Sequence, residues 1–291
     1  MADLLDLAAA ELAEPVDPRV RAMAAAVAAR HGAASRAVLF YGSCLRERQL
    51  DGLMLDFYLI VSNYREAYPR RWLAAANRLI PPNVFPFAHE GLTAKYAVLS
   101  EADFERECSF QARSVSVWAR FSQPSRLVWA ADDAARDRVA AAVSRAVPTL
   151  FALTRPTLPP EQRHEPLAVF REGFRLTYGA ELRAERRERP GSIVDSDPER
   201  YRAFGRAALA EAPASVIPAG SWRWRQRKGK MLTALRLAKA SFTFAGGIDY
   251  LAWKIGRHSG VEVEIKPWQR RWPLVAAVTL LPRLLRRGAI R

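Results

Sequence analysis

The sequence contains few cysteines and no long apolar run. Only Cys44 and Cys108 occur among 291 residues, with neither metal-site nor disulfide-framework spacing, which predicts a reducing compartment. The longest uncharged apolar stretch near the C-terminus, 273–282, is half the roughly 20 residues of a transmembrane helix. The N-terminus lacks the basic region of a secretory signal. We therefore expect a cytoplasmic or cytoplasm-facing protein.

Acidic residues are scarce in the last quarter of the chain. From Gly220 to Arg291 there are 16 Lys or Arg and three acids, which accounts for +13 of the formal charge of +15. This concentration of positive charge predicts an anionic partner for the segment. The apolar share of 50% is ordinary for a folded protein, and the length allows one large core or two modest ones.

Hydrophobic periodicity predicts an α/β (α+β) chain, in which a sheet domain is followed by a helical one. Strands are expected at 37–41, 53–61, 84–88, 93–99 and 126–129, the third and fourth as a hairpin or sheet pair. Helices are expected at 3–31 with a break near Pro15 and Pro18, at 65–79, from a cap at Ser100, and at 132–153, 166–189, 198–212, 224–244, 248–257 and 267–287. The Pro-rich stretch 155–160 then separates two domains: 1–154, an α/β domain with an N-terminal helix, and 155–291, a helical, basic domain.

Two small features of the first domain predict a site for phosphate and metal. Gly42 and Ser43 follow an apolar strand, and Asp56 interrupts the next one. Small residues let backbone amides approach a triphosphate, and a carboxylate on a rigid strand can hold Mg²⁺. The alternatives are a common Gly-Ser turn and an aspartate that only caps a neighbouring loop.

Other charged residues allow two interpretations each. Asp51 is expected to form a turn with Gly52, while Glu90 and Asp103 are either further metal ligands or solvated acids. Lys95 lies in an apolar stretch, where it either binds phosphate or protects an edge strand. Arg120 either binds phosphate or pairs with a local acid such as Glu107.

Six segments carry a resemblance to a known family. They are Tyr41-Gly42-Ser43, Leu55-Asp56-Phe57, residues 94–100, residues 118–124, residues 176–183, and residues 228–234 with Lys239 and Lys254. In this order they resemble motifs of the translocator-maintenance, or mitochondrial-type, phosphatidate cytidylyltransferases, members of the nucleotidyltransferase superfamily. The chain departs at Gln123, where the family has lysine, and at Tyr58, where the superfamily expects a second aspartate. From Val261 onward no segment aligns.

The resemblance implies a nucleotidyltransferase-like domain with a mixed sheet, and it implies a reaction. CMP would pass from CTP to phosphatidic acid, giving CDP-diacylglycerol and pyrophosphate at the membrane's inner face, and nucleic acid is not expected as a partner. Catalytic roles are implied for Asp56, Ser43 and Lys95, with Asp56 holding Mg²⁺. Binding of the triphosphate and other phosphates is implied for Tyr41, Gly42, Ser43, Arg120 and Lys228.

Two other functions are compatible with the same sequence. The chain could be an RNA-modifying nucleotidyltransferase, although apolar runs such as 274–281 favour lipid over RNA in the basic tail. It could also be a catalytically degenerate membrane scaffold, because the second aspartate is missing. The basic, aromatic segments 222–244 and 268–287 suit a bilayer surface, and the alternatives are a solvated face and a packed helix, respectively.

Overall fold

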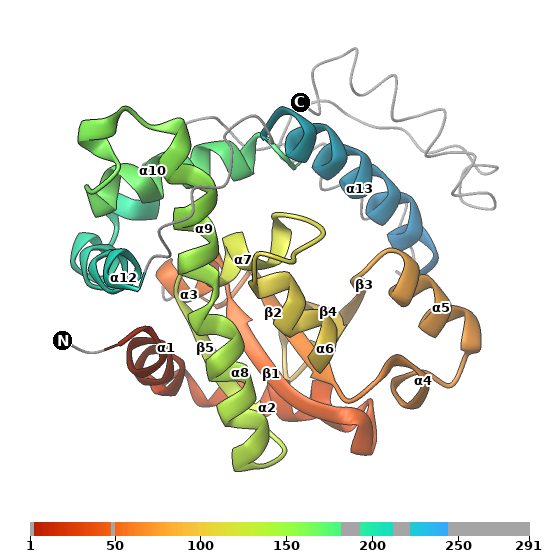
Figure 1. Cartoon of the computed structure of the whole chain (residues 1–291). Helices are drawn as coiled ribbons and strands as arrows, with labels where there is room; N and C mark the ends of the chain where they lie inside the picture. Colours follow the sequence, from red (N-terminus) through yellow and green to blue (C-terminus); the bar gives the residue numbers. More distant parts are fainter. Residues whose placement is uncertain (1–2, 48–49, 182–192, 212–221, 244–291) are drawn as a thin grey trace.

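A five-stranded mixed sheet forms the centre of the protein (Figure 1). The computed structural model describes residues 3–47, 50–181, 193–211 and 222–243. The strands, in the spatial order β3-β4-β2-β1-β5, are β1 (Ser35–Tyr41), β2 (Met54–Val61), β3 (Asn83–His89), β4 (Leu92–Ser100) and β5 (Ser125–Ala130). The β2–β4 pair is parallel and the other three pairs are antiparallel, which confirms the expected α+β class.

The predicted hairpin is confirmed between β3 and β4. Its two-residue turn is Glu90-Gly91, and both residues have positive φ, at 46° and 78°. Such turns match the twist of the strands they join, and glycine adopts positive φ without strain. The parallel β2–β4 pair, in contrast, needs a crossover, which passes through two helices and β3.

Helices of the first half include the predicted segments and two short helices that were not predicted, at 43–47 and 116–121. They are α1 (Leu4–Ala13), α2 (Pro18–Ala29), α3 (Ser43–Glu47), α4 (Tyr64–Ala67), α5 (Arg71–Leu79), α6 (Glu101–Cys108) and α7 (Ser116–Phe121). The single helix expected at 65–79 is divided into α4 and α5, because α4 ends before Tyr68, which is extended at φ −127° and ψ 127°. Tyr68 precedes Pro69, and a residue before proline is driven out of the helical region. At Ser100 the predicted cap is confirmed, since its hydroxyl accepts from the Asp103 amide.

The second half is helical, as expected. Its long helices are α8 (Asp133–Ser144), α9 (Ala146–Thr154), α10 (Pro166–Tyr178), α12 (Pro198–Ala210) and α13 (Trp222–Thr243). The segment expected as one helix at 132–153 is divided at Arg145, close to Pro148, whose ring removes a backbone donor. The expected helices at 248–257 and 267–287 lie outside the described residues.

The two faces of the sheet are covered by different helices. Along β2, Phe57, Leu59 and Val61 point to the face packed by α2, because side chains alternate along a strand. Tyr58 and Ile60 point to the other face, whose core also holds residues of α1, α6–α10 and α12. Asp56 has the same parity as Tyr58 and therefore lies on this second face.

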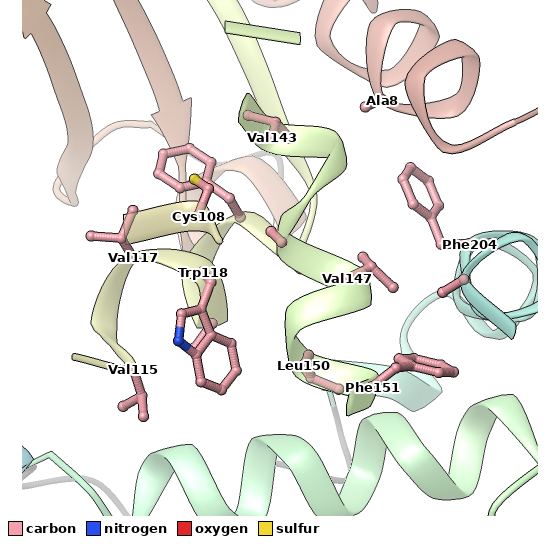
Figure 2. Packing of buried hydrophobic residues seen from close by; sticks show 14 of the residues in the cluster. Ala8, Cys108, Val115, Val117, Trp118, Val143, Val147, Leu150, Phe151 and Phe204 are labelled. Carbon is pink, nitrogen blue, oxygen red and sulfur yellow. The ribbon is translucent and has the colours of Figure 1, made fainter. Parts of the chain in front are cut away.

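Figure 2 shows the second core between α7 and α9, with Trp118 beside Leu150 and with Ala8 and Phe204 approaching from α1 and α12. The core crosses the predicted boundary after residue 154, because the rings of Phe151 and Phe170 pack edge to face at 5.0 Å. Residues on both sides of that boundary are buried together. No helix among the described residues combines the length and the apolar character needed to cross a bilayer.

Candidate functional site

The end of β1 turns sharply against a carboxylate of β2. Tyr41 pairs with Asp56 in the antiparallel register, and Gly42 follows at φ +98° before α3 begins at Ser43. A Cβ atom added at Gly42 would lie only 2.9 Å from Asp56 Oδ2. Position 42 therefore requires glycine for two reasons: the backbone has positive φ, and the Asp56 carboxylate lies too close for a side chain. The Gly-Ser bend and the strand aspartate of the sequence prediction are brought together.

Lys95 completes this small constellation. It pairs with Asp56 in the parallel β2–β4 register, and its Nζ atom lies 2.8 Å from Asp56 Oδ1. The side chains retain 28% and 19% exposure, so the ion pair is half-buried but reachable from solvent. The edge-strand interpretation of Lys95 is wrong, because β4 has β3 on one side and β2 on the other.

Two tyrosines line the same face beside Asp56. The rings of Tyr41 and Tyr58 lie 5.3 Å apart, and both contact Phe121. Burial raises the pKa of both phenols, and for Tyr41 the negative charge of Asp56 adds to this effect. Both groups thus stay protonated at neutral pH, and the position of the expected second aspartate holds a neutral phenol.

Arg120 pairs with an acid that the sequence did not single out. Its Nη1 atom donates to Glu181 Oε1 at 3.0 Å and to the Ser116 carbonyl at 2.5 Å. Burial alone would lower the Arg120 pKa, but the adjacent Glu181 charge more than offsets this and raises it. The pair lies close enough to Tyr41 and Tyr58 to influence the pKa of each phenol.

The two C-terminal motifs meet at one contact. Gly229 of α13 is buried against the segment that follows α10, where an added Cβ atom would lie 2.4 Å from the Ala180 carbonyl oxygen. Gln226 Nε2 donates to the Leu176 carbonyl at 3.2 Å. Lys228 is half-buried beside this contact. Residues 176–181 and 226–229, from two separate motifs of the sequence, therefore lie side by side, and Glu181 of the first segment pairs with Arg120.

Further along α13, two cations point inward. Arg236 donates from Nε to the Pro81 carbonyl at 2.7 Å, and from its two terminal nitrogens to Ser116 Oγ and Ser114 Oγ at 2.9 and 3.2 Å. Lys239 Nζ donates to the carbonyls of Ile80 and Pro82.

Burial lowers the pKa of both groups, for Lys239 to about 7 with a further contribution from the Arg236 charge. The sequence offered one signal for this, because Arg236 is seven residues, two helical turns, after the packed Gly229.

The other candidate acids lie elsewhere. Asp51 is 79% exposed and pairs with Arg19 in a turn, and Glu90 is 64% exposed in the β3–β4 turn. Asp103 follows the far end of β4, where it accepts from the Tyr64 hydroxyl and pairs with Arg106. Among the described residues no three His, Cys, Asp or Glu side chains gather as a metal-binding group.

Asp56 is therefore a lone carboxylate with one oxygen beside Lys95 and the other beside Gly42. Mg²⁺ is commonly held by only one or two carboxylates, with substrate phosphates and water supplying the other ligands. Asp56 Oδ2, next to a bend suited to phosphate, fits such an incomplete site. The donor set is too small for a resident metal held by protein side chains alone.

Comparison with known proteins does not assign the chain. No protein-family model matches it, and no curated protein matches its sequence. What bears on function is therefore the geometry of the site and the order of the motifs that form it.

Proposed function

We propose that the chain is a nucleotidyltransferase that transfers CMP from CTP to phosphatidic acid, giving CDP-diacylglycerol and pyrophosphate. The observation that carries the proposal is the contact of Gly42 with Asp56 at the end of β1, with Lys95 on the next strand. A glycine bend, a carboxylate and a cation on rigid strands are the parts that phosphoryl transfer needs, since its catalysis is mainly positioning and charge neutralisation.

Each residue has a role set by its chemistry. The backbone amides after Gly42 and the Ser43 hydroxyl donate to oxygens of the triphosphate, with the Tyr41 phenol beside them. Lys95 turns its ammonium from Asp56 to the phosphates, where negative charge grows as the bond to pyrophosphate breaks. Mg²⁺ bound at Asp56 would supply further neutralisation of the triphosphate. A phosphate oxygen of the lipid forms the new bond to the α-phosphorus of CTP.

The acceptor is assigned to a lipid because of α13. Its exposed residues combine Trp224, Met231 and Leu235, at 66%, 56% and 42% exposure, with the cations Arg223, Arg227 and Lys230. Aromatic and apolar side chains among cations suit the headgroup region of an anionic bilayer. Lys228, in the first half of α13, and Arg120, which pairs with Glu181 beside this helix, are the cations proposed to bind phosphate.

Incorporation of labelled CMP into lipid tests the proposal. Purified protein with Mg²⁺, labelled CTP and vesicles containing phosphatidic acid should yield labelled lipid. Asp56→Asn should abolish this, whereas Asp51→Asn, which changes an exposed turn acid of the same type, should retain it. Absence of labelled lipid, or equal yields from wild type and Asp56→Asn, would contradict the assignment.

One observation favours a second candidate, a catalytically degenerate membrane scaffold. The ammonium of Lys95 already neutralises Asp56, the one carboxylate that the described part of the chain brings to the Gly42 bend, and Tyr58 stands where a second aspartate is expected. A scaffold would bind anionic vesicles but incorporate no nucleotide into lipid. Labelled RNA in the same assay addresses the RNA-modifying alternative, which no observation on the described residues favours.

A further inference from the structure

Helix α5 presents large apolar side chains to solvent. Leu79 is 78% exposed and Trp72 is 45% exposed, although both belong to residue types that are usually buried. They are seven residues apart, so they lie on the same side of the helix, about 10 Å from one another along its axis. Ala75, between them, is exposed as well. The result is an apolar stripe along the outer side of α5.

Cations flank this stripe. Arg70, Arg71 and Arg78 are exposed, and none forms an ion pair with a residue that the structure describes. The sequence contains no Asp or Glu between Glu66 and Glu90. The positive charge of α5 is therefore not neutralised by any acid of its own segment.

The opposite side of α5 is fixed to the sheet. Asn77 is fully buried, where its Nδ2 atom donates to the Val98 carbonyl at 2.9 Å and its Oδ1 atom accepts from the Asn83 amide. Asn83 Nδ2 in turn donates to the Leu73 carbonyl at 3.0 Å. Because the inner side is held this way, the exposure of Trp72 and Leu79 is a fixed property of the helix orientation.

We propose that the face of α5 formed by Arg70, Arg71, Trp72, Ala75, Arg78 and Leu79 docks on an anionic lipid surface. Exposed aromatic and aliphatic side chains enter the headgroup region, while neighbouring arginines bind lipid phosphates. The charge selects this occupant over a segment of the same chain, because residues 244–291 are themselves basic, with nine Lys or Arg and three acids.

This inference deepens the proposed function, on which it rests for the choice of a lipid partner. Helix α13 meets the end of α5 through Lys239, which donates to the Ile80 carbonyl just beyond Leu79 (Figure 1). The exposed residues of α5 thus begin next to the point where α13 contacts the sheet half of the protein. Helix α5 belongs to the sheet half of the protein and contains none of the motifs on which the reaction was predicted.

Sedimentation with vesicles tests the proposal without any nucleotide. Wild-type protein should bind vesicles of phosphatidylcholine with one quarter phosphatidylglycerol, and bind pure phosphatidylcholine far more weakly. Arg71→Gln/Arg78→Gln should lower the binding constant about thirtyfold, or about 2 kcal/mol, at low salt, since each nearby cation contributes about 1 kcal/mol. Trp72→Ser/Leu79→Ser should lower it at least tenfold at low and high salt alike, because the lost contact is apolar.

Matched controls come from exposed residues elsewhere. Phe110→Ser removes an apolar ring that is 45% exposed, as Trp72 is, and Arg136→Gln/Arg175→Gln removes two arginines that are 63% and 64% exposed. Both should bind vesicles like wild type, and circular dichroism should show the same fold for every variant.

Three results would overturn the docking surface. The first is unchanged vesicle binding in both α5 variants. The second is a changed oligomeric state of Trp72→Ser/Leu79→Ser with vesicle binding intact, and the third is that Arg71→Gln/Arg78→Gln loses binding to RNA but keeps binding to vesicles. This test can fail independently of the CMP-transfer assay. Vesicle binding needs no catalysis, and the transfer assay is run on the wild-type protein, so either result can be negative while the other is positive.

Discussion

Lys95 Nζ and Asp56 Oδ1 are 2.8 Å apart on two parallel strands, at positions paired by the sheet register. Neither strand places the pair alone, because the register is set by a crossover of α4, α5 and β3 between them. The pair joins the only two oppositely charged side chains of β2 and β4. The pair therefore links the stability of the sheet to the chemistry proposed for the site at the Gly42 bend.

Removal of Lys95 should reduce both stability and CMP transfer. In Lys95→Met the carboxylate of Asp56, which is 19% exposed, loses its counter-charge, and the free energy of unfolding should fall by about 1–2 kcal/mol. Urea unfolding of Lys95→Met, Asp56→Asn and the double variant measures this. The double variant should lose less than the sum of the two single losses, yet transfer no CMP. Strict additivity would show that the pair contributes nothing to stability.

Gly42→Ala should inactivate the site. The new methyl group would need positive φ at +98° and would approach Asp56 Oδ2 to 2.9 Å, so a loss of about 1–3 kcal/mol is expected together with at least a hundredfold slower transfer. Gly91→Ala is the matched control, since Gly91 also has positive φ but open space around its Cα atom. It should cost stability and leave transfer intact. Equal activity of the two variants would rule out a role for the Gly42 bend.

Lys239 should give the protein a pH-dependent stability. Burial lowers its pKa from the usual 10.5 to about 7, so the unfolded chain binds more protons than the folded one between these values. The contribution of Lys239 to the free energy of unfolding should consequently rise with pH from about 7 towards 10 and be constant below 7. Urea unfolding at pH 7 and pH 9.5 should show a smaller rise for Lys239→Met than for wild type. Lys230→Met, at an exposed position of the same helix, should match wild type.

Arg200→Met should destabilise the fold strongly. Arg200 pairs with Glu11 at 2.5 Å, both side chains are 8% exposed, and the guanidinium also donates to the Ser122 carbonyl. Its loss would leave the buried Glu11 carboxylate of α1 without a counter-charge, with only the Ser125 amide among the described residues donating to it, at a cost of about 3 kcal/mol or more. Arg202→Met breaks an exposed pair with Glu199 and should change stability by less than about 1 kcal/mol. Similar thermal unfolding of the two variants would contradict this difference.

The sequence predicted features that depend on neighbouring residues. Two short apolar segments close together in sequence predicted the hairpin, and a strand, a bend and a second strand predicted that Gly42 and Asp56 form one site. The break at Pro69 carried an equally local signal that the helical periodicity of 65–79 obscured. Predictions of this kind succeed because backbone geometry within a few residues restricts the possible structures.

Contacts between distant segments could not be predicted in this way. Glu181 is 61 residues from Arg120, and Arg236 is 120 residues from Ser116, so neither pairing follows from periodicity or capping. The same limit applies to Lys95, whose partner depends on the order of strands in the sheet. The basic composition of α13 was evident from the sequence, but two of its cations point inward because the segments 80–82 and 114–116 offer them oxygen acceptors.

Phe170 lies between Phe151 on one side of the predicted domain boundary and Tyr201 on the other, with ring centroids 5.0 and 4.8 Å away. The two halves consequently share one hydrophobic core, so that separating them would expose these rings to water. A substitution in either half that enlarges or removes one of these three rings must therefore be compensated by the residues of the other half that pack against it.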